Sequence, residues 1–245
     1  MKFAASPPET HGTLTKVFKS TEDFCYKLPR TLTLQEGVLV EPLSVAVHAV
    51  KIAKIQPGSH VVIFGAGPVG LLCAAVAMAY GSSKIVVVDI LDDRISFAAK
   101  YVSCTTYKPD PKLNAAQNAA CMIEKYALGN GAGADVTIDA SGAETSIQTG
   151  IEVLKMGGTY VQAGMGKPDI NFPVMAMCTK ELRVHGCFRY AAGDYQLALT
   201  LISEGKVSVK PLISAILPFK QATEAWEIVR RGGGIKTLIQ AYDER

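Results

Sequence analysis

The glycine pattern that begins at Gly65 constrains the fold of this chain more than any other feature. The letters GAGPVG follow the β-branched run HVVIF and open a longer apolar run, and the next β-branched run, KIVVVD, ends at Asp89. In such a strand–turn–helix–strand unit, the first glycine permits a tight turn, Gly67 lets the backbone approach a pyrophosphate, and Gly70 lets the helix pack closely on the strand. Pro68 suits the first helical turn, whose unpaired N–H groups favour phosphate. The pattern therefore predicts a dinucleotide-binding turn.

Asp89 indicates which dinucleotide would bind. A carboxylate at the end of the second strand can accept hydrogen bonds from both hydroxyls of the adenosine ribose, and its charge repels a 2′-phosphate. We therefore expect NAD as the cofactor rather than NADP. A glycine turn that fits by chance and the related fold that binds S-adenosylmethionine are the alternatives. The strand, the helix and the acidic residue together favour the dinucleotide.

Short β-branched runs alternate with helical patterns from His60 onward. The expected strands are HVVIF, KIVVVD, ADVTID, GGTYVQAG and ELRVHGCF, and the expected helices cover residues 68–80, 92–100 and 143–154. Continuous apolar strands that alternate with helices predict right-handed βαβ units. Between residues 108 and 133 we expect an exposed loop, KPDPKLNAAQNAA, and then a short helix that ends in glycines. The predicted fold class is α/β, a doubly wound parallel (Rossmann) sheet.

The two ends of the chain differ from this pattern. Residues 12–29, GTLTKVFKSTEDFCYKLP, alternate like exposed antiparallel strands, and residues 213–240 are typical of a strand, a helix and a second strand. We expect both ends to be pieces of a second domain that flanks the parallel sheet.

Composition narrows the class of partner. The 245 residues are 49% hydrophobic and 19% charged, with a formal net charge of +3. No basic run interleaved with aromatic residues predicts binding to nucleic acid or to a membrane surface, so we expect a small-molecule partner. The start of the chain does not resemble a secretory signal, and the six cysteines lie far apart without a C-x-x-C pair. Both features favour a cytoplasmic protein with reduced thiols.

Several segments together resemble one family of enzymes. They are LVEPLSVAVHAV at residues 39–50, then GAGPVGLL, VVDILDDR, GADVTIDASGAE, GGTYVQAGMG and CFRY. The chain resembles the medium-chain, zinc-dependent polyol dehydrogenases, the family of xylitol and sorbitol dehydrogenases, from about Phe3 to its end. The resemblance implies NAD-dependent oxidation of a polyol to a ketose. It also implies three segments: part of a GroES-like catalytic domain over residues 1–41, an NAD-binding Rossmann domain over 42–189, and the rest of the catalytic domain over 190–245.

The resemblance also implies roles for individual residues. Its cofactor contacts, added to the glycine turn, are Val69, Asp89, Arg94, Ala163, Gly164, Met165, Cys187, Phe188 and Arg189. Arg189 and Tyr190 would reach sugar hydroxyls, and Glu41 corresponds to the carboxylate beside the catalytic zinc and its water. From the residues alone, Glu41 is a surface charge at the start of a helix. His48 lies on an apolar helix, where we expect a satisfied core histidine rather than a metal ligand.

The zinc ligands of the family are a cysteine near the start of the chain and a later GHE segment, and neither is found here. We therefore expect a truncated chain that carries little zinc. We expect turnover near background until the upstream segment is restored, because zinc stabilises the alkoxide that donates the hydride. A non-catalytic NAD-binding or oligomerising module and a zinc-independent reductase of the same superfamily are the alternative functions. We also expect the chain to form a homo-oligomer, because the Rossmann half often carries the subunit interface in enzymes of the family that it resembles.

Overall fold

The computed structural model describes residues 5–6, 8–15 and 17–241. Phe3, where the resemblance begins, lies outside them. The described residues form two compact units, one comprising Thr31–Val209 and the other drawn from Met1–Arg30 and Lys210–Arg245. The boundaries expected from the resemblance lay at residues 41 and 189, so the sheet-bearing unit is longer than that segment at both ends. Within the described part of the chain, no helix is long and apolar enough to cross a membrane.

Six parallel strands form the central sheet of the Thr31–Val209 unit. They are β3 (His60–Phe64), β4 (Lys84–Val88), β5 (Thr105–Tyr107), β6 (Ala134–Asp139), β7 (Leu154–Gln162) and β8 (Arg183–Gly186). Their spatial order is β5-β4-β3-β6-β7-β8. The order reverses between β3 and β6, which is the switch point where open α/β sheets bind ligands. The predicted doubly wound parallel sheet is confirmed.

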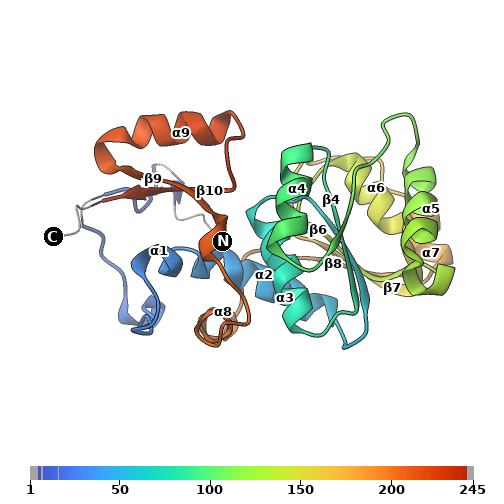
Figure 1. Cartoon of the computed structure of the whole chain (residues 1–245), viewed down its shortest axis with the longest axis horizontal. Coiled ribbons are helices and arrows are strands. Elements are labelled where there is room, and N and C mark those ends of the chain that lie inside the picture. Colours follow the sequence, from blue (N-terminus) through green and yellow to red (C-terminus); the bar gives the residue numbers. More distant parts are fainter. Residues whose placement is uncertain (1–4, 7, 16, 242–245) are drawn as a thin grey trace. The chain divides into compact units, whose positions relative to one another are not determined.

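Helices cover both faces of this sheet (Figure 1). The helices of the Thr31–Val209 unit are α1 (Leu34–Gly37), α2 (Val40–Ala53), α3 (Pro68–Ala79), α4 (Asp92–Tyr101), α5 (Ala115–Tyr126), α6 (Glu144–Glu152), α7 (Val174–Thr179) and α8 (Asp194–Ser203), of which α1 and α8 lie away from the sheet. On one face, Val62 and Phe64 of β3 pack in a buried cluster with Met122 of α5 and Ile151 of α6. On the other side of the sheet lie α3 and α4, and α2 packs against both α3 and α8. The near-continuous apolar runs of β3, β4 and β6 follow from this coverage, because these central strands bury both of their faces.

The segment between residues 108 and 133 corrects one prediction. Helix α5 begins at Ala115, inside the stretch expected to be an exposed loop. Asn114 caps it: its side chain accepts a hydrogen bond from the backbone N–H of Gln117, and the Gln117 side chain accepts one from the backbone N–H of Asn114. This capping box starts the helix earlier than the polar, proline-containing composition indicated.

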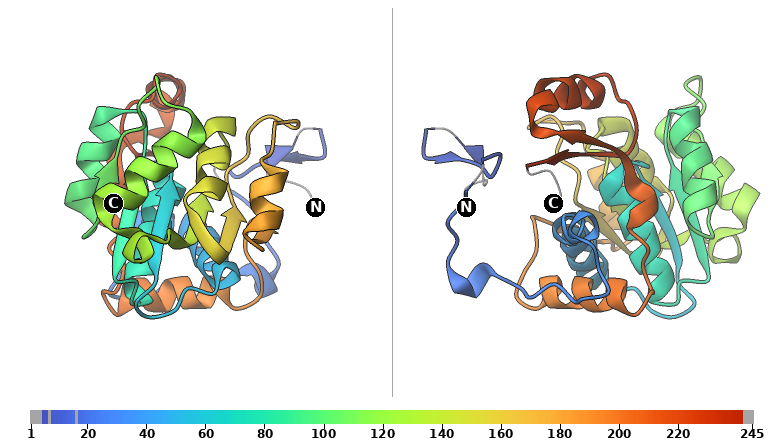
Figure 2. Two further views of the ribbon diagram at one scale, coloured as in Figure 1. Left: turned by 90° about the vertical axis from the view of Figure 1, so that its right-hand side faces the viewer. Right: turned by 60° about the vertical axis from the view of Figure 1, so that its left-hand side comes forward.

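The second unit has little regular structure before residue 30. It contains the two-residue strands β1 (Ala5–Ser6) and β2 (Thr10–His11), the 3-10 helix Glu22–Phe24, and then β9 (Ile213–Pro218), α9 (Ala222–Arg230) and β10 (Lys236–Gln240). The predicted strand, helix and strand at the end of the chain are confirmed, and β9 pairs with β10 in parallel, with α9 along them (Figure 2). The antiparallel strands predicted over residues 12–29 are wrong. The described residues of that segment pair with no other strand, and a strand without a hydrogen-bonded neighbour is not stable.

Candidate cofactor and substrate site

The glycine turn after β3 is shaped by contacts that only glycine permits. Gly65 has φ +94°, in the left-handed region that glycine adopts without strain. A Cβ added at Gly70 would lie 1.7 Å from the carbonyl oxygen of Gly65, so the first turn of α3 rests directly on the turn. A Cβ at Gly67, by contrast, would meet no atom of the protein within 4 Å. The space above Gly67 is therefore open to a ligand.

The start of α3 completes this cradle. Gly67 is the N-cap of the helix, it makes no side-chain capping bond, and Pro68 occupies the first turn. The first N–H groups of any helix lack partners within the helix, and they carry the positive end of its dipole. The open space above Gly67 and the exposed helix start are compatible with a pyrophosphate, and its binding at this turn stays a prediction.

Asp89 lies directly after β4 and is buried. Its Oδ2 accepts a hydrogen bond from the backbone N–H of Ala66 at 2.8 Å, and its Oδ1 accepts one from the N–H of Leu91 at 3.0 Å. Arg94 lies 3.9 Å from the same carboxylate. A carboxylate accepts about four hydrogen bonds, so Asp89 retains capacity for a ribose diol. The hydrogen bond from Ala66 also means that Asp89 holds the glycine turn in position, a role that sequence reasoning did not identify.

The other predicted cofactor residues gather at the same edge of the sheet. Phe64, Asp139, Gln162 and Gly186 stand in register across β3, β6, β7 and β8, so these strands end together. Ala163, Gly164 and Met165 follow the end of β7, and Cys187, Phe188 and Arg189 follow the end of β8. The N–H of Cys187 donates to the carbonyl of Gln162 at 2.8 Å, which ties these two segments to each other.

Asp139 organises the loops at this edge, and sequence reasoning missed it. Its Oδ1 accepts hydrogen bonds from the N–H groups of Ser141 at 2.9 Å and Gly142 at 2.6 Å, and its backbone carbonyl accepts from those of Ala163 and Gly164. Burial raises the pKa of Asp139, although the hydrogen bonds from Gly142 and Ser141 act in the opposite direction. An acidic residue that ends a buried strand and precedes Ala-Ser-Gly was the available signal.

The two loops that Asp139 joins also touch through their backbones. A Cβ at Gly142 would lie 2.6 Å from the carbonyl carbon of Met165, and one at Gly166 would lie 1.8 Å from the carbonyl oxygen of Gly142. A Cβ at Gly164 would lie 2.4 Å from the N atom of Gly142. The loop after β7 is therefore held at a fixed position beside the loop after β6.

The predicted substrate residues come from two parts of the same unit. Glu41 is exposed in the first turn of α2, which agrees with the surface charge expected from the residues alone. Arg189 has φ +58°, and its guanidinium lies 5.7 Å from the ring centre of Phe188. Tyr190 stacks edge-on against Tyr195, with ring centres 5.5 Å apart. Whether these three side chains form one substrate site stays a prediction.

Asp194 fixes the segment that carries Arg189 and Tyr190. This buried residue begins α8, and its Oδ2 accepts a hydrogen bond from the N–H of Ala191 at 2.7 Å. It pairs with His48 at 2.8 Å and with Lys51 at 2.6 Å, both on α2. Burial acts to raise the pKa of Asp194, but the hydrogen bonds from Lys51 and Ala191 and the neighbouring positive charges lower it overall. His48 is thus a partnered histidine of the helix interface, as expected.

The described residues do not fit a zinc ion. No group of three or more His, Cys, Asp or Glu among them could hold a metal. All six cysteines are free. Burial raises the pKa of Cys73, and that of Cys187 to about 11, so neither favours the thiolate that a metal binds.

Comparison with known proteins gives one matching family and a set of similar sequences. Residues 68–204 match the family described as "Zinc-binding dehydrogenase". The chain is 59% identical to D-xylulose reductase A of Aspergillus niger, over 99% of this chain and 67% of that protein. It is 55% identical to D-xylulose reductase A of Aspergillus oryzae, also over 99% of this chain and 67% of that protein.

Solved structures with the same fold are also found. L-idonate 5-dehydrogenase from Escherichia coli aligns with a TM-score of 0.84 and 26% identity, over 97% of this chain and 66% of that one. An Escherichia coli oxidoreductase of unknown specificity, ECK1772, aligns with a TM-score of 0.87 and 26% identity, over 98% of this chain and 67% of that one.

Proposed function

Because this chain belongs to the zinc-binding dehydrogenase family, we propose that it serves the NAD-dependent oxidation of a polyol of the xylitol or sorbitol type to the ketose. The observation that carries the substrate class is the 59% identity, over 99% of this chain, to the D-xylulose reductase of A. niger. The cradle at Gly67 and the carboxylate of Asp89 support NAD as the cofactor.

In this proposal the cofactor contacts are divided among the strand ends. The N–H groups at the start of α3 hold the pyrophosphate, and Asp89 accepts hydrogen bonds from the adenosine ribose, with Arg94 over the adenosine. The loops after β7 and β8 hold the nicotinamide half, through Ala163–Met165 and Cys187–Arg189. When bound, NAD would supply the hydride acceptor for oxidation of the carbinol carbon.

The polyol would be held by polar side chains of the same unit. Arg189 donates and Tyr190 donates or accepts hydrogen bonds with sugar hydroxyls, and the exposed Glu41 carboxylate accepts one from the reacting hydroxyl. These roles rest on the resemblance and on the exposed or half-buried state of the three side chains. No step is assigned to a metal, because the described residues do not fit one.

The test measures NAD reduction during incubation with xylitol, sorbitol and zinc, together with NAD and NADP affinity by calorimetry. Two proteins are compared: this chain, and a chimera that adds the part of the A. niger relative this chain does not cover. Tight NAD binding with polyol oxidation by either protein supports the proposal. NAD binding without turnover in both favours a non-catalytic module, and turnover of enones but not polyols favours a zinc-independent reductase.

We also propose that the chain forms a homo-oligomer in the cytoplasm. Strand β8 is an edge strand of the six-stranded sheet, and its Val184 side chain is 39% exposed. Met156 of β7 and Met175 of α7 are each 72% exposed. An unpaired edge beside exposed apolar side chains favours association. Light scattering after size exclusion tests this, and a monomer at all concentrations would contradict it.

A further inference from the structure

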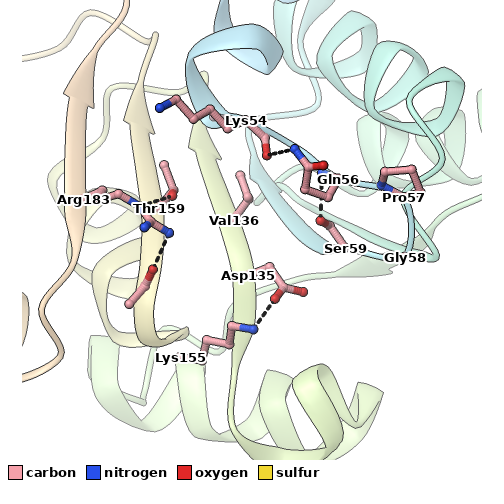
Figure 3. Close-up of a pocket in the computed structure, with 12 residues that line it drawn as sticks. Lys54, Gln56, Pro57, Gly58, Ser59, Asp135, Val136, Lys155, Thr159 and Arg183 are labelled. Carbon is pink, nitrogen blue, oxygen red and sulfur yellow. Dashed lines mark hydrogen bonds and ion pairs between the residues drawn. The ribbon is translucent and has the colours of Figure 1, made fainter.

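We propose that a polar pocket at the amino ends of the sheet strands binds the phosphate group of a phosphorylated sugar (Figure 3). The pocket has a volume of about 500 Å³. Its lining includes Ser59 before β3, Asp135 at the start of β6 and Arg183 at the start of β8. It therefore lies at the edge of the sheet opposite the cofactor cradle, and the site residues described above take no part in it.

The charged side chains of the pocket leave an excess of positive charge. Lys54, Lys155 and Arg183 line it with one acidic residue, Asp135. Each oxygen of Asp135 already has a partner: its Oδ1 pairs with Lys155, and its Oδ2 accepts a hydrogen bond from the N–H of His60 at 2.7 Å. The charges of Lys54 and Arg183 therefore have no counter-charge in the pocket.

These two cations also retain unused hydrogen-bond donors. The Nε of Arg183 donates to the hydroxyl of Thr159 at 3.1 Å, and its Nη2 donates to the carbonyl of Gly157 at 2.6 Å. A guanidinium has five N–H donors, so the remaining ones are available in a plane that these contacts fix. Among the described residues, the Lys54 ammonium has neither an ion pair nor a hydrogen bond. Figure 3 shows its side chain extending toward the side of the pocket where Thr159 and Arg183 lie.

The chemistry of this donor set matches a phosphate monoester. A phosphate monoester carries about 1.5 to 2 negative charges at neutral pH and three acceptor oxygens, and guanidinium and ammonium groups bind such oxygens well. The rest of the lining suits a sugar. The Nε2 of Gln56 donates a hydrogen bond to the carbonyl of Lys54 at 3.2 Å, which leaves the side-chain oxygen of Gln56 to accept one from a sugar hydroxyl. The hydroxyl of Ser59 accepts a hydrogen bond from the N–H of Gln56 and can still donate one to the sugar. The volume lies within the range of about 300–1,000 Å³ typical of small-ligand sites.

Isothermal titration calorimetry of the full chain with D-ribose 5-phosphate at low ionic strength tests the proposal, with D-ribose as the uncharged control. NAD is present at saturation so that the phosphate does not occupy the cradle. Lys54→Gly removes one cation and suits the backbone, because Lys54 has φ +53°. Arg183→Gln removes the second cation, and Lys100→Gln, at an exposed position near the end of α4, is the matched control.

We expect saturable binding of the ester, competition by inorganic phosphate, and no binding of D-ribose. Each pocket variant should weaken binding about tenfold, the value of one charge-assisted hydrogen bond, and Lys100→Gln should leave it unchanged. Thermal melting checks that Arg183→Gln folds; if it does not, Lys54→Gly alone decides. The proposal is overturned if the ester does not bind, if D-ribose binds equally, or if Lys54→Gly binds as tightly as the control variant. Lys54→Gly and Lys100→Gln are measured under the same conditions, so the difference between their affinities reports on the pocket whether or not NAD occupies the cradle.

Discussion

Gly67 and Gly70 at the start of α3 have different steric surroundings, and substituting each with alanine distinguishes their roles in folding and in NAD binding. A Cβ at Gly70 would lie 1.7 Å from the carbonyl oxygen and 2.9 Å from the carbonyl carbon of Gly65. A Cβ at Gly67 would meet nothing within 4 Å. Gly70→Ala should therefore damage the fold and NAD binding together, whereas Gly67→Ala should damage NAD binding alone.

The size of each effect follows from these contacts. Non-bonded carbon and oxygen approach to about 3.3 Å, so Gly70→Ala must move the helix start by roughly 1.6 Å. Both sides are backbone, so we expect a cost near the upper end of overpacking, about 3 kcal/mol, which lowers the melting temperature by about 6–12 °C. Gly67 has φ −78°, which alanine adopts freely. Alanine is less favourable than glycine at an N-cap, but it also reduces the entropy of the unfolded chain. These two effects nearly cancel, so the melting temperature of Gly67→Ala should stay within about 2 °C of that of the unchanged chain.

Thermal melting and NAD titration by calorimetry, on both variants and the unchanged chain, measure these effects. Gly67→Ala should weaken NAD binding about 10- to 100-fold, because the methyl group displaces a phosphate from the helix N–H groups and such charged hydrogen bonds contribute about 1.5–3 kcal/mol. Unchanged NAD affinity in Gly67→Ala would refute the cradle. An unchanged melting temperature in Gly70→Ala would refute the close approach of α3 to the turn.

Three further outcomes are expected. Asp89→Ser should narrow the preference for NAD over NADP, because it removes the charge that repels the 2′-phosphate, and calorimetry with both cofactors measures this; an unchanged ratio would contradict it. Asp194→Asn should destabilise the chain by about 2 kcal/mol at neutral pH, since it removes the buried carboxylate that pairs with the partly exposed His48 and Lys51. Because folding lowers the pKa of Asp194, its contribution to the free energy of unfolding is present above the unfolded-state pKa of about 3.9 and is lost as pH falls toward the lower folded-state pKa. The melting temperatures of Asp194→Asn and of the unchanged chain, measured across pH, should therefore converge in acid. Cys73, fully buried and with a raised pKa, should react with a thiol reagent only after unfolding, whereas the exposed Cys25, Cys121 and Cys178 react at once.

The sequence predicted those parts of the fold that depend on local pattern and on burial. The central strands β3, β4 and β6 bury both faces, so their apolar runs are continuous and easily recognised. Residues 12–29 show alternation too, but alternation fixes only which side chains share a face, and a strand also needs a partner. Within that segment Val17 and Phe24 are each 78% exposed, so no described face is buried there. The start of α5 was missed because proline and polar residues outweighed the reciprocal cap between Asn114 and Gln117.

The residues of the candidate site likewise divide into those that a local pattern predicts and those that depend on contacts between distant segments. The positions of the glycine turn and Asp89 could be predicted because they belong to one strand–turn–helix–strand unit, where spacing along the chain fixes geometry. The role of Asp139 could not, because it joins the loops after β6 and β7, and that contact depends on the register of two strands. Asp194 is a similar case, since its partners on α2 lie 143 residues away along the chain at Lys51. Both carboxylates are buried, so each needs the donors that the fold supplies. In this chain, therefore, the glycine turn and Asp89 follow from local sequence, whereas the groups that fix the positions of the site loops emerge only when distant segments are brought together.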